Sequence, residues 1–70
     1  MLQILYTKNS QDNSFYASFS NELGYVSECA DTLVELENKV RICMDALYEE
    51  ELEQTPAVEF VRVSENKFFN

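Results

Sequence analysis

The feature that most constrains this chain is one stretch in which apolar residues recur at helical spacing, with strand-like stretches on both sides. From Thr32 onward the apolar residues lie three or four positions apart, which is the period of an amphipathic helix. The stripe comprises Leu33, Leu36, Val40, Cys43 and Leu47, and it is flanked by Val34, Met44 and Tyr48. A single helix cannot enclose a core, so we expect it to cover a sheet built from the rest of the chain.

The predicted helix has a clear beginning and a clear limit. Thr32 and Glu35 form a capping-box pattern, in which the hydroxyl accepts from the Glu35 amide and the Glu35 carboxylate reaches back. We expect the helix to extend to about Leu52, before Pro56 breaks the pattern. Two (i, i+4) pairs of opposite charge support its exposed face, Glu35 with Lys39 and Glu37 with Arg41.

Four other stretches are rich in β-forming residues, and three of them alternate in polarity, so we predict that each is a strand. Three precede the helix as an antiparallel meander and one follows it: 2–7, 14–19, 25–29 and 57–63. The last has apolar residues on both faces, which indicates cover on both sides or pairing across a dimer. The predicted fold class is α+β, in the order strand, strand, strand, helix, strand.

Gly24, the only glycine of the chain, lies between the second and third predicted strands. A tight connection there requires positive φ, which glycine adopts without a steric penalty. We therefore predict that Gly24 is a turn residue with positive φ and not part of a phosphate-binding loop.

The chain carries five Lys and Arg residues against 13 Asp and Glu residues, a net charge of -8. This balance argues against direct binding to nucleic acid or to an anionic membrane, because both need clustered cations. It favours a basic protein partner, although negative charge can also serve solubility alone. The N-terminus has no basic region followed by a long apolar stretch, so we expect no signal peptide and no membrane span, and a soluble, cytoplasmic protein.

No constellation of catalytic residues is apparent. The chain has no histidine for proton transfer, and carboxylates that metal-dependent hydrolysis would need are scattered over loop and strand positions, at Asp12, Glu22, Glu28 and Glu59. Cys29 and Cys43 are not arranged in a C-x-x-C motif, which argues against a zinc or redox site. We predict two reduced, half-buried thiols in place of a disulfide. We therefore expect no enzyme, no metal and no cofactor.

Acidic residues gather around the end of the predicted helix, where the helix dipole is already negative. They are Asp45, Glu49, Glu50, Glu51 and Glu53. One interpretation is a solvated face, which is the usual role of a charge run on a helix. The other is a docking surface for a basic protein.

Four segments together resemble the HicB family of antitoxins and related small proteins with a partial ribonuclease H fold. They are "SFYASFS", "ELGYVSE", "ADTLVEL" and the acidic helix end "DALYEEELEQTP". The chain departs from the family pattern at Asn21, where a proline is usual, and at Ala30, where a glycine is frequent. The resemblance implies one HicB-like domain over residues 1–70, without the DNA-binding segment that many family members carry.

The resemblance also implies a function: the acidic surface would mask a small basic ribonuclease toxin of the HicA type. Two alternatives stay open, a phage-type acidic inhibitor of a host defence protein and a small oligomeric protein whose partner is itself. We further expect a homodimer, formed through a strand edge or through the apolar surface around Val61, Val63, Phe68 and Phe69.

Overall fold

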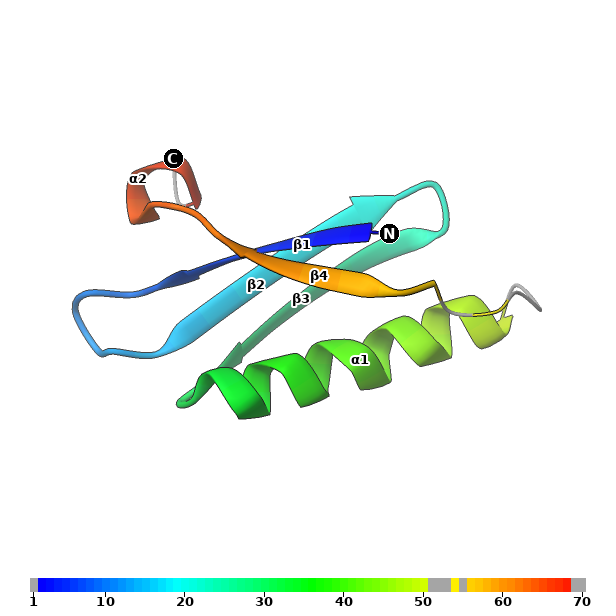
Figure 1. Ribbon diagram of the computed structural model, residues 1–70, viewed down its shortest axis with the longest axis horizontal. Helices are drawn as coiled ribbons and strands as arrows, with labels where there is room; N and C mark the ends of the chain where they lie inside the picture. The colour runs from blue at the N-terminus through cyan, green and yellow to red at the C-terminus, as the bar shows by residue number, and fades with distance from the viewer. Residues whose placement is uncertain (1, 51–53, 55, 69–70) are drawn as a thin grey trace.

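Four strands form one sheet, and one long helix lies across one of its faces (Figure 1). In the computed structural model, residues 2–50, 54 and 56–68 are described. The elements in chain order are β1 (Leu2–Lys8), β2 (Phe15–Asn21), β3 (Gly24–Ala30), α1 (Leu33–Glu50), β4 (Val58–Arg62) and α2 (Glu65–Phe68). The predicted α+β class and the order of three strands, helix and fourth strand are confirmed.

The sheet is mixed, with the strand order β3-β2-β1-β4. β1, β2 and β3 form the predicted antiparallel meander, in which Ser18 pairs with Leu5 on one side and with Ser27 on the other. After α1 the chain returns to the far side of β1, and β4 pairs with β1 in parallel. β4 is therefore an edge strand with β1 as its neighbour, and its apolar residues are half-buried on both faces. The predicted alternatives, cover on both sides or pairing across a dimer, stay open.

The core lies between α1 and the sheet face that α1 covers. Alternate strand residues point to this face, as the period of two requires, and the helical stripe meets them. The buried apolar residues are Ile4, Ala17, Val26, Ala30, Leu36, Val40, Met44 and Tyr48. Burial of side chains of this size is the dominant stabilising term, about 1.5–3 kcal/mol for each large aliphatic residue.

The outer face of α1 differs from prediction at Val34. Its side chain is 68% exposed, as is Ile42 at 69%, so Val34 lies on the solvent side and does not flank the buried stripe. Met44 and Tyr48 are buried as predicted. Val34 lies about 100° from Leu33 around the helix axis, which turns it away from the face that meets the sheet.

The start of α1 carries half of the predicted capping box. The Glu35 amide donates to Thr32 Oγ1 at 3.2 Å, but the reciprocal bond from the Thr32 amide to the Glu35 carboxylate is not formed. Of the two predicted ion pairs, Glu37 and Arg41 lie 3.7 Å apart, whereas Lys39 donates to the Cys29 carbonyl at 2.9 Å and not to Glu35. The acceptor of Lys39 is a backbone carbonyl of β3, so this bond cannot be predicted from the sequence of the helix alone.

A second, short helix follows β4, where we had predicted only one helix in the chain. Glu65 at its start accepts from the Ser10 hydroxyl at 2.9 Å and from the Ser10 amide at 3.1 Å. These bonds join α2 to the loop between β1 and β2, and α2 packs beside β1. On the same strand, β1, the polar side chain of Thr7 is buried, with only 2% of its surface exposed.

Candidate protein-binding surface

The predicted acidic residues fall partly within the described structure. Asp45 and Glu49 lie one turn apart on α1, and both side chains are exposed. Glu50 closes α1, and its side chain lies outside the described part, as do residues Glu51 and Glu53 altogether. The structure therefore places two of the five predicted carboxylates on a common outward surface.

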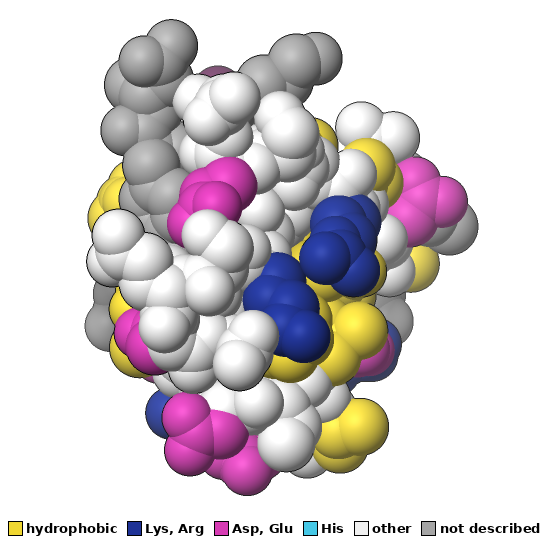
Figure 2. Space-filling model, turned by 90° about the vertical axis from the view of Figure 1, so that its left-hand side faces the viewer, with side chains coloured by type: hydrophobic (Ala, Val, Ile, Leu, Met, Phe, Trp, Pro, Cys, Tyr) yellow, Lys and Arg dark blue, Asp and Glu magenta, His cyan; other side chains and the backbone are white. Residues whose placement is uncertain are grey.

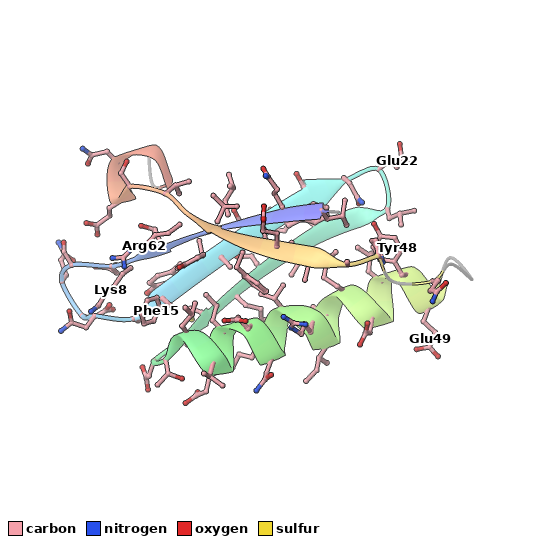
Figure 3. All side chains as sticks on the ribbon, viewed as in Figure 1. Lys8, Phe15, Glu22, Tyr48, Glu49 and Arg62 are labelled. Carbon is pink, nitrogen blue, oxygen red and sulfur yellow. The ribbon has the colours of Figure 1, made fainter. Side chains whose placement is uncertain are left out.

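A third carboxylate joins them from the turn between β2 and β3. Glu22 is exposed at the tip of this hairpin, and Figure 3 shows it at the same end of the molecule as Glu49, with Tyr48 between them. We call the surface formed by Glu22, Asp45 and Glu49 the acidic end. The sequence contains no signal that Glu22 belongs to this surface, because Glu22 lies 23 positions before Asp45 and only the tertiary structure brings it to the same end.

Gly24 allows the hairpin to approach the helix. Its φ of 157° confirms the predicted positive sign. A Cβ at this position would meet Leu47 Cδ1 at 2.9 Å, which is closer than such atoms pack. Gly24 is the first residue of β3 and follows directly after the two turn residues Glu22 and Leu23, so it is the last residue of the four-residue turn that begins at Asn21.

Asn21 fixes the same junction with three hydrogen bonds. Its Oδ1 accepts from the amides of Leu23 at 3.0 Å and Gly24 at 3.3 Å, which closes the turn. Its Nδ2 donates to the Tyr48 hydroxyl at 3.2 Å, which joins the turn to α1. The resemblance marks Asn21 as a departure from the usual proline, and the structure gives this asparagine bonds that a proline could not make.

The carboxylates of the acidic end form no ion pair with a described Lys or Arg, although Arg41 lies one turn before Asp45 and lines the same hollow. The last turn of α1 contains no basic residue, and none of Glu22, Asp45 and Glu49 lies within ion-pair distance of a described Lys or Arg. Carboxylates at the C-terminal end of a helix also repel the negative end of its dipole, at a cost of a few tenths of a kcal/mol each. The arrangement therefore lowers the stability of the helix end and leaves its negative charge available to a partner.

Two cations gather at the opposite end of the molecule. Lys8 Nζ lies 5.7 Å from the centre of the Phe15 ring, and Arg62 pairs in register with Tyr6 on the same sheet face. Figure 2 looks onto this end and shows cationic side chains over apolar ones, and Figure 3 labels Lys8, Phe15 and Arg62 there. Acidic side chains also lie on this end (Figure 2), so its charge is mixed.

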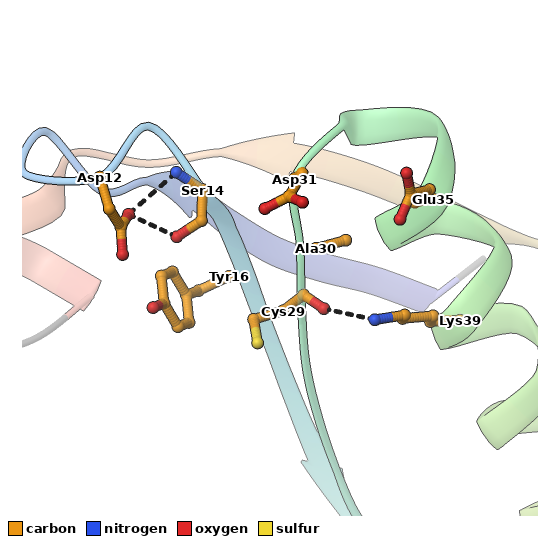
Figure 4. A pocket seen from close by; sticks show the side chains of 8 residues that line it. All are labelled: Asp12, Ser14, Tyr16, Cys29, Ala30, Asp31, Glu35 and Lys39. Carbon is orange, nitrogen blue, oxygen red and sulfur yellow. Dashed lines mark hydrogen bonds between the residues drawn. The ribbon is translucent and has the colours of Figure 1, made fainter.

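A shallow hollow near the start of α1 brings three carboxylates into one neighbourhood, Asp12, Asp31 and Glu35 (Figure 4). Within the described residues, no group of three or more His, Cys, Asp or Glu side chains is arranged to hold a metal ion. Asp12 instead accepts from the Ser14 hydroxyl at 2.6 Å and from the Ser14 amide at 2.9 Å, and these bonds lower the pKa of its carboxyl group. Asp12 thus stabilises the loop between β1 and β2.

The two cysteines are free thiols, as predicted, but their environments differ. Cys29 is exposed on the outer face of β3, which corrects the prediction that it is half-buried. Cys43 is half-buried, and its thiol donates to Glu28 Oε2 at 3.1 Å. This hydrogen bond, with burial and the charge of Glu28, raises the pKa of Cys43, so its thiol keeps its proton at neutral pH and is a poor nucleophile.

The apolar residues predicted to form a dimer interface are separated by the fold. Val61 pairs in register with Leu5, which is 42% exposed, on the sheet face opposite α1, and Val63 is half-buried just beyond β4. The Phe68 side chain and Phe69 lie outside the described part. The homodimer therefore stays a prediction.

Comparisons with protein-family models, with curated proteins and with solved structures found no match to this chain. The resemblance to HicB antitoxins thus depends on the sequence segments alone and stays a hypothesis. Of the helices in residues 2–50, 54 and 56–68, none combines the length and the apolar character that crossing a bilayer requires.

Proposed function

We propose that this protein is a non-enzymatic protein-binding module that docks a basic partner on its acidic end. The observation that carries the proposal is the exposure of Glu22 and Glu49 at one end of the molecule, with Asp45 one turn before Glu49 on α1, and the lack of an ion pair between these carboxylates and any described Lys or Arg. Exposed, unpaired charges of one sign attract an opposite surface and accelerate its association.

The stability cost at the helix end supports a docking surface over a merely solvated face. Carboxylates elsewhere on the surface would keep the protein hydrated equally well. At the start of α1, for example, the helix dipole would also favour them. At the C-terminal end, Glu49 opposes the dipole. A basic partner would offset this repulsion on binding.

The resemblance to HicB antitoxins supplies a specific partner class, a small basic ribonuclease of the HicA type. In this proposal the acidic end covers the cationic face with which such an enzyme binds RNA, and so prevents RNA from reaching it. The protein would then act in the cytoplasm, as a neutraliser that needs no catalytic group of its own.

Co-expression with the product of an adjacent gene, followed by pull-down and a growth-rescue assay, tests this function. We expect the partner to co-purify and its toxicity to be suppressed. Binding without rescue would retain the protein-binding module and remove the antitoxin assignment. If no basic protein binds at all, the proposed function is wrong, and self-association would be the function to pursue.

A charge-matched pair of double variants tests the surface. Asp45→Asn with Glu49→Gln should slow association with the basic partner several-fold at low salt. Asp31→Asn with Glu35→Gln changes the net charge equally at the other end of α1 and should slow it less. Because attraction between exposed charges is screened over about 8 Å at physiological ionic strength, the difference should shrink as salt rises. Equal slowing by both variants would show that net charge acts without a defined surface.

A further inference from the structure

We propose that the outer edge of β3, together with the groove between β3 and α1, accepts an extended basic segment of the partner as an added strand. This inference depends on the proposed function, since it assumes a basic protein partner, and it specifies how that partner binds. Strand addition supplies affinity through main-chain hydrogen bonds, and pockets for alternate side chains supply specificity.

The direction of the β3 backbone is fixed by one contact. Lys39 Nζ donates to the Cys29 carbonyl at 2.9 Å, so this carbonyl points away from β2 and toward the free edge (Figure 4). In an antiparallel pair, alternate residues turn both backbone groups outward. Ser27 and Tyr25 therefore also present their N–H and C=O groups at the edge, where no described residue bonds to them.

The helix turns this edge into a groove. An open hollow runs between β3 and the second half of α1, with Tyr25, Val26 and Ser27 on the strand side and Cys43, Ala46 and Leu47 on the helix side. Tyr25 is 67% exposed although it is a large aromatic residue. An added strand would cover Tyr25 and place alternate side chains against the apolar wall of α1.

The charges around the groove determine the kind of strand. Glu28 lines it, and Glu22 lies two positions before Gly24, the first residue of β3, at the end of the molecule where Figure 3 also shows Glu49. Lys39 bonds the last free carbonyl at the other end, and so limits the accessible edge to the part around Tyr25 and Ser27. A second copy of this chain would bring the same carboxylates and a net charge of -8, so a segment rich in Lys or Arg is the complementary occupant.

The other free edge lacks these properties. β4 is five residues long against seven for β3, and Pro56 shortly before it has no amide proton to donate. The hollow between α1 and the start of β4 is lined by both Arg41 and Asp45, so it selects neither charge. We therefore expect a basic strand to pair with the edge of β3 and not with the edge of β4.

The test uses a short fluorescent peptide in which lysine and valine alternate, and a copy of that peptide with methylated backbone nitrogens. Both copies carry the same charge, but the methylated one cannot pair as a strand. We expect the unmodified peptide to bind by fluorescence anisotropy and the methylated one to bind at least about tenfold more weakly, which corresponds to roughly one or two lost hydrogen bonds.

Ser27→Pro is the matching change in the protein, with Ser27→Ala as its control. Proline removes an amide proton that points to the free edge, so the pairing of β3 with β2 is retained, whereas alanine keeps that proton. We expect Ser27→Pro to reduce peptide affinity about tenfold and Ser27→Ala to leave it unchanged. Hydrogen exchange should slow at the Tyr25 and Ser27 amides when the peptide binds.

The outcomes separate the two proposals. If both peptides bind equally and Ser27→Pro has no effect, the protein binds basic segments by charge alone, and strand addition is wrong while the proposed function stands. If neither peptide binds and the natural partner is not captured either, the proposed function itself fails. Dimerisation that Ser27→Pro abolishes would identify a second copy as the occupant and would overturn the basic-strand assignment.

Discussion

The two ends of α1 are stabilised in different ways. At its start, Thr32 caps the helix through the Glu35 amide, and carboxylates at Asp31 and Glu35 suit the positive end of the dipole. At its end no basic residue is present in the last turn, and the charge at Glu49 opposes the dipole. There the hairpin between β2 and β3 packs on the helix through Leu47 and Tyr48.

The difference teaches where local and tertiary forces act in a small domain. The first turn is stabilised by residues within four positions of one another. The last turns depend on contacts with residues more than twenty positions earlier in the chain. An end that is held by the sheet can carry unfavourable local charge, and this allows it to serve as a binding surface.

The largest expected effect is the loss of the hairpin contact in Gly24→Val. Positive φ strains a β-branched residue, and the added carbons meet Leu47, so the free energy of unfolding should fall by more than about 1 kcal/mol, within the 1–3 kcal/mol typical of backbone strain. Chemical denaturation measures it. Gly24→Val in a Leu47→Ala background separates the causes, because removing Leu47 relieves the clash but not the strain. Coincident midpoints for wild type and Gly24→Val would refute the assignment.

Asn21→Ala should have the next largest effect. It removes two bonds within the turn and one to Tyr48, so we expect a loss of about 1–2 kcal/mol. Tyr48→Phe removes the interelement bond alone and should cost about 0.5–1 kcal/mol. Equal losses in the two variants would mean that the bonds to the Leu23 and Gly24 amides contribute nothing.

Thr32→Ala tests the opposite end of the helix. Loss of the cap should cost about 1 kcal/mol, and Thr32→Ser, which keeps the hydroxyl, should cost much less. Urea denaturation followed by circular dichroism gives both values. A cost greater than that of Asn21→Ala would reverse the comparison of the two ends.

The smallest effects come from charge reversal. Glu49→Lys should raise the free energy of unfolding by a few tenths of a kcal/mol, and Glu35→Lys should lower it by a similar amount, because the dipole has opposite sign at the two ends. Thermal denaturation at low salt resolves such differences. Glu49→Lys should nevertheless weaken binding of the basic partner, so stability and binding would move in opposite directions. Changes of the same sign in both variants would exclude the dipole as their cause.

Much of the fold could be predicted because its signals are local. The alternation in β1, the helical stripe from Leu33 and the cap at Thr32 depend on neighbours in the sequence, and the structure confirms all three. The candidate site was predicted less completely. Asp45 and Glu49 form a run that can be read from the sequence, whereas Glu22 joins them only because the hairpin packs on α1.

The sequence by itself determined the order of strands and helix, the buried stripe of α1, the positive φ of Gly24 and the excess of negative charge. The tertiary structure alone decided that β4 pairs with β1, that Lys39 bonds the edge of β3, and that Cys43 donates to Glu28. The physical reason is the distance along the chain over which each interaction acts. Periodicity, capping and backbone preference act between residues close in the chain, whereas strand order and side-chain partners depend on which distant surfaces the core brings together.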